Sequence, residues 1–502
     1  ATRIGKTGLI EKGRENLLLQ SNQFDTTWGT TNASVTSGQS GYDGSSDAWL
    51  LNVTGGTCCQ QIAQNISVSG VNTFSAYVKK GTKEGCLIYA SGSGNPYADF
   101  NLAAGSVINK YNGAIDAKIQ PVGNDWYRCS VSFTGSINQV RIYVADASGG
   151  ISQTSGNIYI QDAQVEQGLV ASPYIPTTTT SAQAGVLENT PRLNYTAGVA
   201  NPSLLLEPSR TQLLPYTEWI GGWSDVNDAT IDGVKSFTLG STSARIQAGS
   251  IGSPSGDFVF YAVFDSADIG KTIRLAYFDG TASSWNTGSD ITIDSNGRAE
   301  RLISTGSNVI GNVAFYGTST SQSFTLKYCQ FEQGSYPTSY IPNHSGGTIT
   351  RGAEVCGDAG DATTFNSTEG VLYAEIAALV NGDADRSIVL SDGTTSNYLR
   401  ITLHANSNRI AFFSSAGVNY NNFDFSQTDN LKIAFQYKAN DWKVYINGIL
   451  KTQLSALTFS PNTLSDLSFS LVNTSPFYGK TKQVLVFKEA LSDTELIKLT
   501  TI

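Results

Sequence analysis

Alternation of apolar and polar residues is clearest near the end of the chain. Over 431–438 and 442–446, apolar side chains recur at alternate positions, which predicts strands with one buried and one solvated face. Asn447 and Gly448 follow the second stretch and are suited to the positive φ angles of a tight hairpin turn. We therefore expect a β-hairpin here.

Shorter strand-like stretches, separated by Gly, Ser and Asn turns, fill much of the remaining chain. They include 71–80, 125–133, 138–145 and 257–264. Long amphipathic helical periods are nearly absent, which favours an all-β fold of two-sheet sandwiches. One exception is a capping-box pattern at Ser492 and Glu495 before an apolar stretch, which predicts a short final helix.

One phrase occurs twice: AQVEQG with SPYIPTT at 163–178, and CQFEQG with TSYIPNH at 329–344. The shared positions are Gln164, Glu166, Gly168, Tyr174, Ile175 and Pro176, which recur as Gln330, Glu332, Gly334, Tyr340, Ile341 and Pro342. The constant offset indicates two copies of one structural template. The openings NLLLQSNQF and QLLPYTEW repeat with a different offset, so we infer internal deletions in the second copy.

Apolar parity changes just before each shared Gln and Glu. Positions 158 and 160 are apolar, and the apolar character then moves to 163 and 165. Either the strand is bulged, or Gln164 and Glu166 point inward and need partners. Our interpretation is that backbone or Tyr hydrogen bonds to Glu166 and Glu332 hold the YIP tail; contact with a ligand or calcium is the alternative.

At 502 residues the chain fits about three domains. The predicted organisation is an N-terminal arm at 1–15, a sandwich at 16–178, a linker at 179–211, a second sandwich at 212–346 and a third module at 347–502. The arm contains three glycines and little periodicity, as expected for a segment that orders on a partner.

The charge pattern gives little support to nucleic-acid or anionic-membrane binding. The formal net charge is -9, and Lys and Arg do not cluster. No apolar run approaches the about 20 residues that cross a bilayer, so we expect no membrane insertion. Because the sequence begins at Ala1, we expect a processed or excised start, and a removed upstream signal stays open.

The cysteines show neither a CxxC pair nor regular spacing. They are Cys58, Cys59, Cys86, Cys129, Cys329 and Cys356. Cys129 and Cys329 fall in strand-like apolar stretches, where small buried thiols are common. We expect all six to be reduced and structural.

No catalytic residues are predicted. The two histidines, His344 and His404, lie in separate contexts, which disfavours a triad or a multi-histidine metal site. A glycosidase would need a pair of carboxylates, and no motif singles out a pair among the 41 acidic residues.

Glycan recognition would use exposed aromatic faces. Trp223, Trp285 and Tyr97 sit among turn residues and are the predicted glycan-stacking candidates. Trp28, Trp49, Trp126 and Trp442 lie in apolar stretches and are predicted core residues. Asp383 and Asp385 form an oxygen-rich loop that makes structural Ca²⁺ a weaker hypothesis.

Several segments resemble known families. NLLLQSNQFDTTW, DWYRCSVSF, NIYIQDAQVEQG and SPYIPTT resemble the carbohydrate-binding-module-like jelly rolls of tailed-bacteriophage structural proteins, and 191–214 resembles a segment that often precedes them. Residues 366–500, with WKVYINGI and LVFKEALSDTELIKLT, resemble the concanavalin A-like, laminin-G-like sandwich. The implied fold is all-β, with tandem antiparallel jelly rolls followed by a concanavalin A-like domain.

The resemblance implies a non-enzymatic fibre, tail or head-decoration protein, assembled in the host cytoplasm, whose arm contacts other virion proteins and whose sandwiches meet host-surface glycans. It also implies a homo-oligomer, with a trimer preferred. A polysaccharide-degrading enzyme with two accessory modules and a secreted bacterial adhesin stay open as alternatives.

Overall fold

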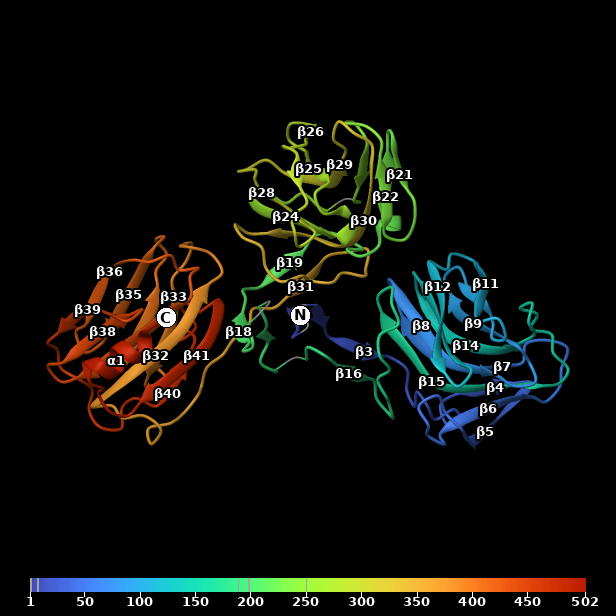
Figure 1. Ribbon diagram of the computed structural model, residues 1–502, viewed down its shortest axis with the longest axis horizontal. Helices are drawn as coiled ribbons and strands as arrows, with labels where there is room; N and C mark the ends of the chain where they lie inside the picture. The colour runs from blue at the N-terminus through green and yellow to red at the C-terminus, as the bar shows by residue number, and fades with distance from the viewer. Residues whose placement is uncertain (1, 7–8, 188, 197–198, 250) are drawn as a thin grey trace. The chain divides into compact units, whose positions relative to one another are not determined.

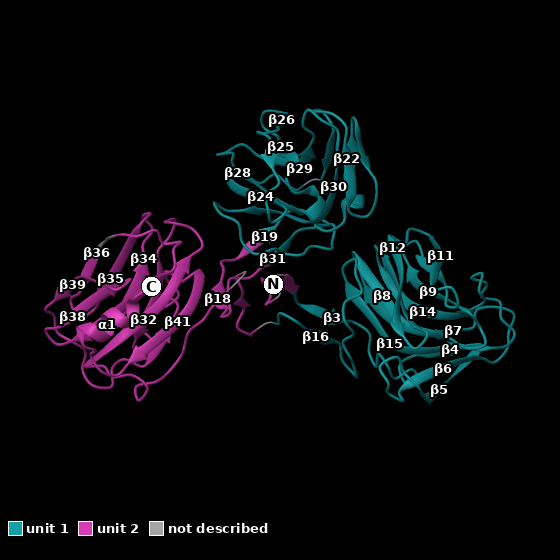
Figure 2. Cartoon of the chain, viewed as in Figure 1, with its two compact units in different colours: residues 1, 12–187, 211–350 teal, residues 2–11, 188–210, 351–502 magenta. Residues whose placement is uncertain are grey.

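The structure is a computed structural model. It describes residues 2–6, 9–187, 189–196, 199–249 and 251–502. The chain divides into two compact units (Figure 2). Unit 1 comprises residues 12–187 and 211–350, and unit 2 comprises residues 2–11, 188–210 and 351–502. The chain therefore contributes to unit 2 in three separate segments, and the two jelly-roll sequences lie between them.

Module 1 is a sandwich of two antiparallel sheets (Figure 1). Sheet 1A has the order β11 (Ser106–Tyr111), β10 (Tyr97–Asn101), β9 (Gly85–Gly92), β14 (Ile137–Ala145), β7 (Gln61–Val68) and β4 (Gly29–Thr31). Sheet 1B has the order β12 (Asp116–Gly123), β13 (Trp126–Phe133), β8 (Asn72–Lys80), β15 (Asn157–Gln167), β6 (Ala48–Val53) and β5 (Ala33–Gln39). Alternate side chains of both sheets meet in one apolar core.

Module 2 has the same two-sheet plan. Sheet 2A contains β20 (Ser224–Val226), β23 (Arg245–Gln247), β29 (Ile310–Tyr316), β25 (Thr272–Asp279) and β26 (Ser284–Asn286), with β27 (Ile291–Thr292) beside β25. Sheet 2B contains β21 (Ala229–Ile231), β22 (Ser236–Leu239), β30 (Gln322–Gln333), β19 (Arg210–Gln212) and β31 (Ile349–Arg351), with β24 (Asp257–Phe264) pairing with β30 and β28 (Arg298–Ser304). Short 3-10 turns occupy Ile220–Gly222 and Ser266–Asp268.

The C-terminal module in unit 2 is a third sandwich. Sheet 3A contains β17 (Leu193–Asn194), β18 (Ser203–Leu206), β41 (Gly479–Phe487), β32 (Glu369–Ala378), β37 (Leu431–Lys438), β38 (Trp442–Ile446) and β39 (Ile449–Leu454). Sheet 3B contains β36 (Asn419–Asp424), β35 (Arg409–Ser414), β34 (Tyr398–Leu403), β33 (Arg386–Ser391) and β40 (Asp466–Ser468). The all-β sandwich fold predicted from the sequence is confirmed.

The strongest local predictions are also confirmed. β38 and β39 are joined by Asn447 and Gly448, whose φ angles are 51° and 80°. Helix α1 (Asp493–Thr500) begins after Ser492, which forms a capping box with Glu495. No helix among the described residues is both long and apolar enough to cross a membrane.

The predicted arm and linker differ from the structure. Residues 2–4 and 10–12 form strands β1 (Thr2–Ile4) and β2 (Ile10–Lys12), and β3 (Arg14–Asn16) pairs with β16 (Ala182–Ala184). Within the predicted linker 179–211, β18 pairs with β41 and becomes part of sheet 3A. The reason is the apolar run Leu204 to Leu206, in which Leu206 is part of the core of the C-terminal module and Leu204 packs against that core. The polar residues on both sides of this apolar run made the segment resemble a linker, so the strand was not predicted from composition.

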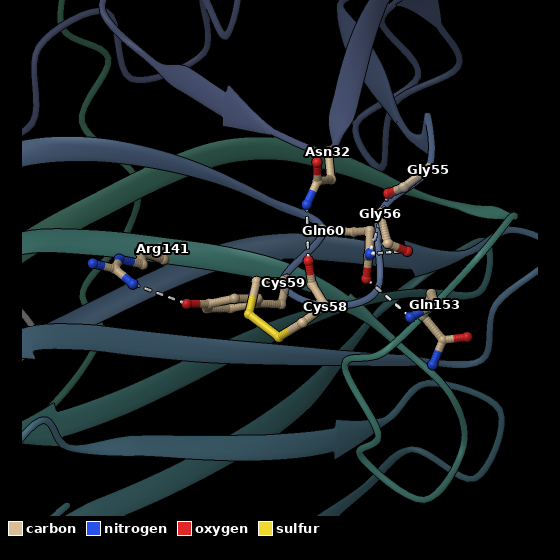
Figure 3. The surroundings of a disulfide bond; sticks show 9 residues. Asn32, Gly55, Gly56, Cys58, Cys59, Gln60, Arg141 and Gln153 are labelled. Atoms are coloured by element: carbon tan, nitrogen blue, oxygen red, sulfur yellow. Dashed lines mark hydrogen bonds between the residues drawn. A yellow bond between two sulfur atoms is a disulfide. The ribbon is translucent and has the colours of Figure 1, made fainter.

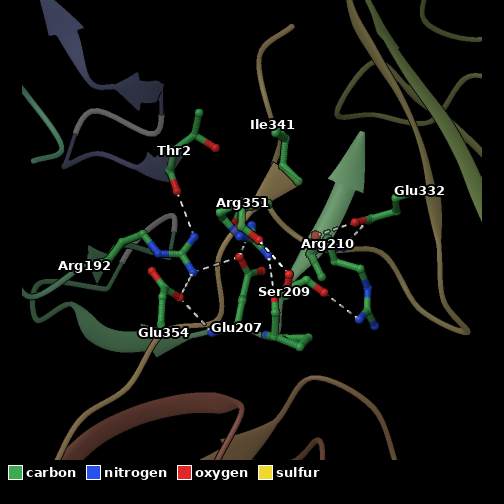
Figure 4. Close-up of polar contacts among 12 residues, drawn as sticks. Thr2, Arg192, Glu207, Ser209, Arg210, Glu332, Ile341, Arg351 and Glu354 are labelled. Atoms are coloured by element: carbon green, nitrogen blue, oxygen red, sulfur yellow. Dashed lines mark hydrogen bonds and ion pairs between the residues drawn. The ribbon is translucent and has the colours of Figure 1, made fainter. Parts of the chain in front are cut away.

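Buried ion pairs join the three chain segments of unit 2 (Figure 4). Glu207 Oε2 lies 2.8 Å from Arg192 Nη2 and 2.6 Å from Arg351 Nη1. Glu354 also pairs with Arg192 and accepts a 2.7 Å hydrogen bond from the Glu207 amide. Arg192 in turn donates to the Thr2 carbonyl at 2.9 Å. The opposite charges compensate one another, and removing one from such a buried group typically costs about 3–5 kcal/mol.

Candidate functional site

The outer face of sheet 1A carries a group of tyrosines. Ile88, Ala98 and Ile142 point into the module 1 core. Side chains alternate along a strand, so their neighbours face away from the core. These outward residues are Tyr89 on β9, Tyr97 on β10, Arg141 and Tyr143 on β14, and Tyr111 on β11.

Strand register places these side chains in two neighbouring rows. The first row is Tyr111, Tyr97, Tyr89 and Arg141. The second row is Asn109, Asp99, Leu87, Tyr143 and Gln61. Opposed side chains in antiparallel sheets have Cβ atoms about 4.5–5.5 Å apart, so each row forms a continuous surface across the strands.

The tyrosine rings contact one another along this surface. The Tyr97 ring centroid lies 4.6 Å from that of Tyr111 and 5.7 Å from that of Tyr89, and both pairs are stacked. Tyr143 meets Tyr89 edge-on at 6.1 Å. Burial raises the pKa of Tyr89 and of Tyr97, so both phenols remain protonated at neutral pH and can donate hydrogen bonds.

These rings surround a pocket of about 320 Å³. Leu87 and Asp99 also line it, as do Gly149 and Ile151 from the loop after β14. The volume falls near the lower end of small-ligand sites, which span about 300–1,000 Å³. An aromatic wall with a few polar groups is the usual composition of such sites.

Asp99 is the acidic group of the pocket. Asp99 is only 5% exposed, and within the described part of the chain its Oδ1 has no hydrogen-bond partner. Burial raises the pKa of Asp99 to about 6, while a hydrogen bond from Tyr111 opposes the rise. Gly149 has a φ of 90°, and a Cβ at this position would lie 2.7 Å from Asp99 Oδ2. The bare glycine therefore leaves room for the carboxylate.

A disulfide lies beside this pocket. Cys58 and Cys59 are bonded to each other (Figure 3), so the prediction that all six cysteines are reduced is wrong for this pair. The Cys59 amide donates to the Ile151 carbonyl at 3.2 Å, which joins the disulfide loop to the pocket edge. Cys59 has a φ of 74°, a local turn that cysteine spacing does not reveal. The free cysteines are Cys86, Cys129, Cys329 and Cys356.

The repeated phrase forms a buried network in module 1. Glu166 accepts hydrogen bonds from the backbone amide of Ser172 at 2.8 Å, from its hydroxyl, and from Gln164 at 2.6 Å. Gln164 Oε1 accepts from the Ile175 amide at 2.8 Å, just before Pro176. Tyr174 contacts the Ser21 hydroxyl at 2.6 Å. We call this set the module 1 tail network, because it holds the segment after β15.

The equivalent residues form the module 2 tail network. Glu332 accepts from the Thr338 amide at 2.7 Å and from its hydroxyl at 2.6 Å. Gln330 Oε1 accepts from the Ile341 amide at 2.6 Å, just before Pro342, and Tyr340 contacts Thr217 at 2.6 Å. The parity change before Gln164 is a β-bulge between Gln161 and Gln164. These carboxylates are thus occupied by the protein's own tail.

The other aromatic candidates differ in exposure. Trp223 is only 5% exposed and stacks on Phe315 at 5.3 Å, so the expectation that it faces solvent is contradicted. Its chain neighbours are turn residues, but the ring turns into the module 2 core. Trp285 is half-buried on the outer face of sheet 2A, with the Arg245 guanidinium 5.1 Å from its ring.

The four tryptophans predicted in cores are buried: Trp28, Trp49, Trp126 and Trp442.

The two aspartates of the calcium candidate loop have partners within the protein. Asp383 Oδ2 lies 3.5 Å from Arg386, and Asp385 accepts a hydrogen bond from the Ala405 amide at 2.7 Å. Among the described residues, no group of three or more His, Cys, Asp or Glu side chains is placed to hold a metal ion. Within the described part of the chain, no cluster of ligand side chains therefore supports the calcium hypothesis for this loop.

Sequence analysis placed Tyr97 among the candidates but missed the residues around it. Those are Tyr89, Asp99, Tyr111, Arg141 and Tyr143. A signal was present, since Tyr89, Tyr97 and Tyr143 each alternate with core residues and so share the outward parity of their strands. The missing information was strand order, which brings β10 and β14 to either side of β9.

Comparisons with solved structures return β-sandwich proteins. The CBM40 of the Ruminococcus gnavus IT-sialidase, bound to α2,3-sialyllactose, is 18% identical over 29% of this chain and 93% of its own, with a TM-score of 0.25. The CBM22-1–CBM22-2 tandem domain of Paenibacillus barcinonensis Xyn10C is 12% identical over 64% of this chain and 98% of its own, with a TM-score of 0.22.

The LG1-3 region of the laminin α2 chain is 11% identical over 86% of this chain and 96% of its own, with a TM-score of 0.16. No protein-family model and no curated protein matches the sequence. The case for function accordingly rests on the residues of the pocket.

Proposed function

We propose that module 1 binds glycans through the outer face of sheet 1A. The observation that supports this is the row of Tyr111, Tyr97 and Tyr89 beside a pocket that also contains Asp99. Tyrosine faces stack on the C–H faces of sugar rings, and phenol and carboxylate groups bind sugar hydroxyls. Both kinds of contact lie on rigid strands, so little ordering is needed on binding.

The neighbouring arginine supports a stacking role for the face. The Arg141 guanidinium lies 5.3 Å from the Tyr89 ring, donates to Gln139 at 2.6 Å and donates to the Tyr143 hydroxyl at 3.1 Å. These contacts fix the orientation of two of the four rings. A surface ordered before binding loses less entropy when a flexible oligosaccharide docks.

The wider proposal is that the chain displays its sandwiches on a tailed-phage virion as a non-enzymatic structural protein. It is supported by the resemblance of the repeated phrase and of residues 191–214 to phage jelly rolls. Mass spectrometry of purified particles is expected to detect the chain, and its absence from them would contradict this location. Release of new reducing ends from host polysaccharide would contradict the non-enzymatic role.

Glycan binding is tested with the full chain on an array of host-surface oligosaccharides. The Tyr97→Ala and Tyr111→Ala variants are each expected to lose about tenfold in affinity, because each removes a stacking face worth about 1.4 kcal/mol. Tyr398→Ala, at a half-buried tyrosine of β34, is the matched control and should bind normally. Equal binding by all four proteins would reject this face as the site.

A further inference from the structure

The buried carboxylate of Asp99 restricts what the pocket can accept. Asp99 Oδ1 has no hydrogen-bond partner among the residues that the structure describes, although Asp99 is 95% buried. A buried polar atom without a partner costs free energy, and a ligand that supplies a donor recovers that cost. The pocket is therefore suited to a ligand group that donates a hydrogen bond.

The charge around Asp99 is not compensated by a cation. Among the described residues, no lysine or arginine forms an ion pair with Asp99. The nearest outward arginine in the strand rows is Arg141, whose donors are used by Gln139 and the Tyr143 hydroxyl. An anionic sugar would meet the Asp99 charge in a partly desolvated pocket, where repulsion is strong because water screens it little.

We infer that Asp99 is a specificity-determining residue that selects uncharged, hydroxyl-donating saccharides and rejects carboxylated or sulfated ones. This inference rests on the proposed glycan-binding function. In this arrangement the sugar ring stacks on Tyr97 and Tyr89 while a hydroxyl donates to Asp99. Gly149 also contributes to this specificity, because any side chain at this position would displace the Asp99 carboxylate.

The groups that face Asp99 do not offset its charge at physiological pH. They are the phenols of Tyr97 and Tyr111, and those of Tyr89 and Tyr143, which line the same pocket. Asp146 lies in the loop that carries Gly149. Hydrogen bonds from Ser148 hold the pKa of Asp146 below its usual value, so it remains ionised. Asp99 itself, with a pKa of about 6, changes charge between pH 5 and pH 8.

The experiment compares neutral gluco-oligosaccharides with uronic-acid oligosaccharides of equal length, using the full chain and calorimetry. The unmodified protein is expected to bind the neutral member at least tenfold more tightly. Asp99→Asn keeps the shape but removes the charge, and should reduce this ratio to about threefold or less. Tyr97→Ala should weaken binding of neutral sugars without removing the preference.

A second measurement does not depend on the variant. Uronic acids remain charged at pH 5, whereas Asp99 becomes largely protonated, so the preference of the unmodified protein should shrink between pH 8 and pH 5. Equal or tighter binding of the acidic sugar at pH 8, or a ratio unchanged in Asp99→Asn, would overturn the inference and leave glycan binding intact. Absence of any saccharide binding would overturn the proposed function as well.

Discussion

In module 1 Glu166 accepts hydrogen bonds from the amide and hydroxyl of Ser172, and in module 2 Glu332 accepts the same pair from Thr338. The opening strands match as well. Asn16 accepts from the Val165 amide at 3.2 Å, and Gln212 accepts from the Phe331 amide at 2.9 Å. Both jelly rolls thus hold their two chain ends with equivalent buried polar groups.

Their outer faces differ. Sheet 1A presents Tyr89 on β9 and Tyr143 on β14, which line a pocket. β25 and β29 of sheet 2A instead present Ala276, Ala314 and Tyr316, which pack against Trp285. Buried polar groups must keep their partners, since losing one leaves the other unsatisfied. Outward positions carry no such constraint. The difference indicates that the repeated phrase maintains the fold, while the side chains on the outer sheet faces vary between the two modules.

Removing the tail carboxylate should produce the largest effect. Glu166→Ala leaves the Ser172 amide and Gln164 without their acceptor, and we expect a loss of about 4 kcal/mol in the stability of module 1. Glu332→Ala should destabilise module 2 similarly. Hydrogen exchange followed by mass spectrometry on the full chain resolves β8 and β24 separately, so each variant should deprotect its own module.

Glu84→Ala is the control for this comparison, because Glu84 is exposed in module 1. It should leave protection of β8 unchanged. If Glu166→Ala had no more effect than Glu84→Ala, the tail network would not be a stabilising element.

Local patterns predicted several elements of the fold because local interactions determine them. Asn447 and Gly448 accept positive φ angles, and Ser492 and Glu495 satisfy helix-end amides by themselves. The repeated Gln and Glu were interpretable because the parity change implied a bulge, which the register between Gln161 and Gln164 contains. The contribution of β18 to sheet 3A was not predictable, because its partner β41 is far away in sequence.

The candidate site depended on the same distant pairing. Tyr97 was predicted as a candidate because turn residues surround it in the sequence. The proposed site also requires Tyr111 and Tyr89, and only the strand register places them opposite Tyr97. Trp223 is also surrounded by turn residues in the sequence, yet its ring stacks on Phe315 in the module 2 core. Turn residues near an aromatic therefore do not determine the direction of its ring. The disulfide at Cys58 and Cys59 was missed because it needs a particular backbone turn.

A change of pH should affect the stabilities of the two modules in opposite directions. Burial raises the pKa of Asp99 to about 6 and that of Asp162 to about 7, above their unfolded values near 4. Their protonated forms are favoured in the folded state, so module 1 is most stable below pH 4 as far as these groups are concerned, and loses stability as pH rises from 4 to 7. Module 2 has the opposite tendency, because backbone amides lower the pKa of Asp265 and Asp279.

The predicted pH dependence of stability is checked by denaturant unfolding at pH 5 and pH 8. Unfolding is followed by hydrogen exchange, with correction for the intrinsic exchange rates. Module 1 peptides should be more stable at pH 5, and the Asp99→Asn/Asp162→Asn double variant should lose that difference. The outcome that would contradict the assignment is equal stability of module 1 at both values.

Aromatic truncation tests whether the outer faces differ in function. Tyr89→Ala should weaken binding of a neutral oligosaccharide about tenfold, since a stacked ring contributes about 1.4 kcal/mol. Trp285→Ala should change it less than twofold, because Trp285 belongs to sheet 2A and is not part of the row of Tyr111, Tyr97 and Tyr89 that forms the proposed site. Calorimetry on the full chain measures both. A comparable loss in Trp285→Ala would show that the second face also binds, and the contrast between the modules would fail.

The smallest expected effect concerns the disulfide, which lies on the pocket side of module 1. Replacing both cysteines, as Cys58→Ser/Cys59→Ser, frees the loop whose Cys59 amide bonds to the Ile151 carbonyl. Because this loop reaches the pocket through Ile151, which is one of several lining residues, affinity for the neutral oligosaccharide should fall about two- to fivefold, which is less than 1 kcal/mol. A reducing agent should reproduce this loss in the unmodified chain and leave the double variant unchanged. If reduction weakened binding equally in both proteins, the effect would lie elsewhere, and the disulfide would be a feature of the loop without influence on the tyrosine face.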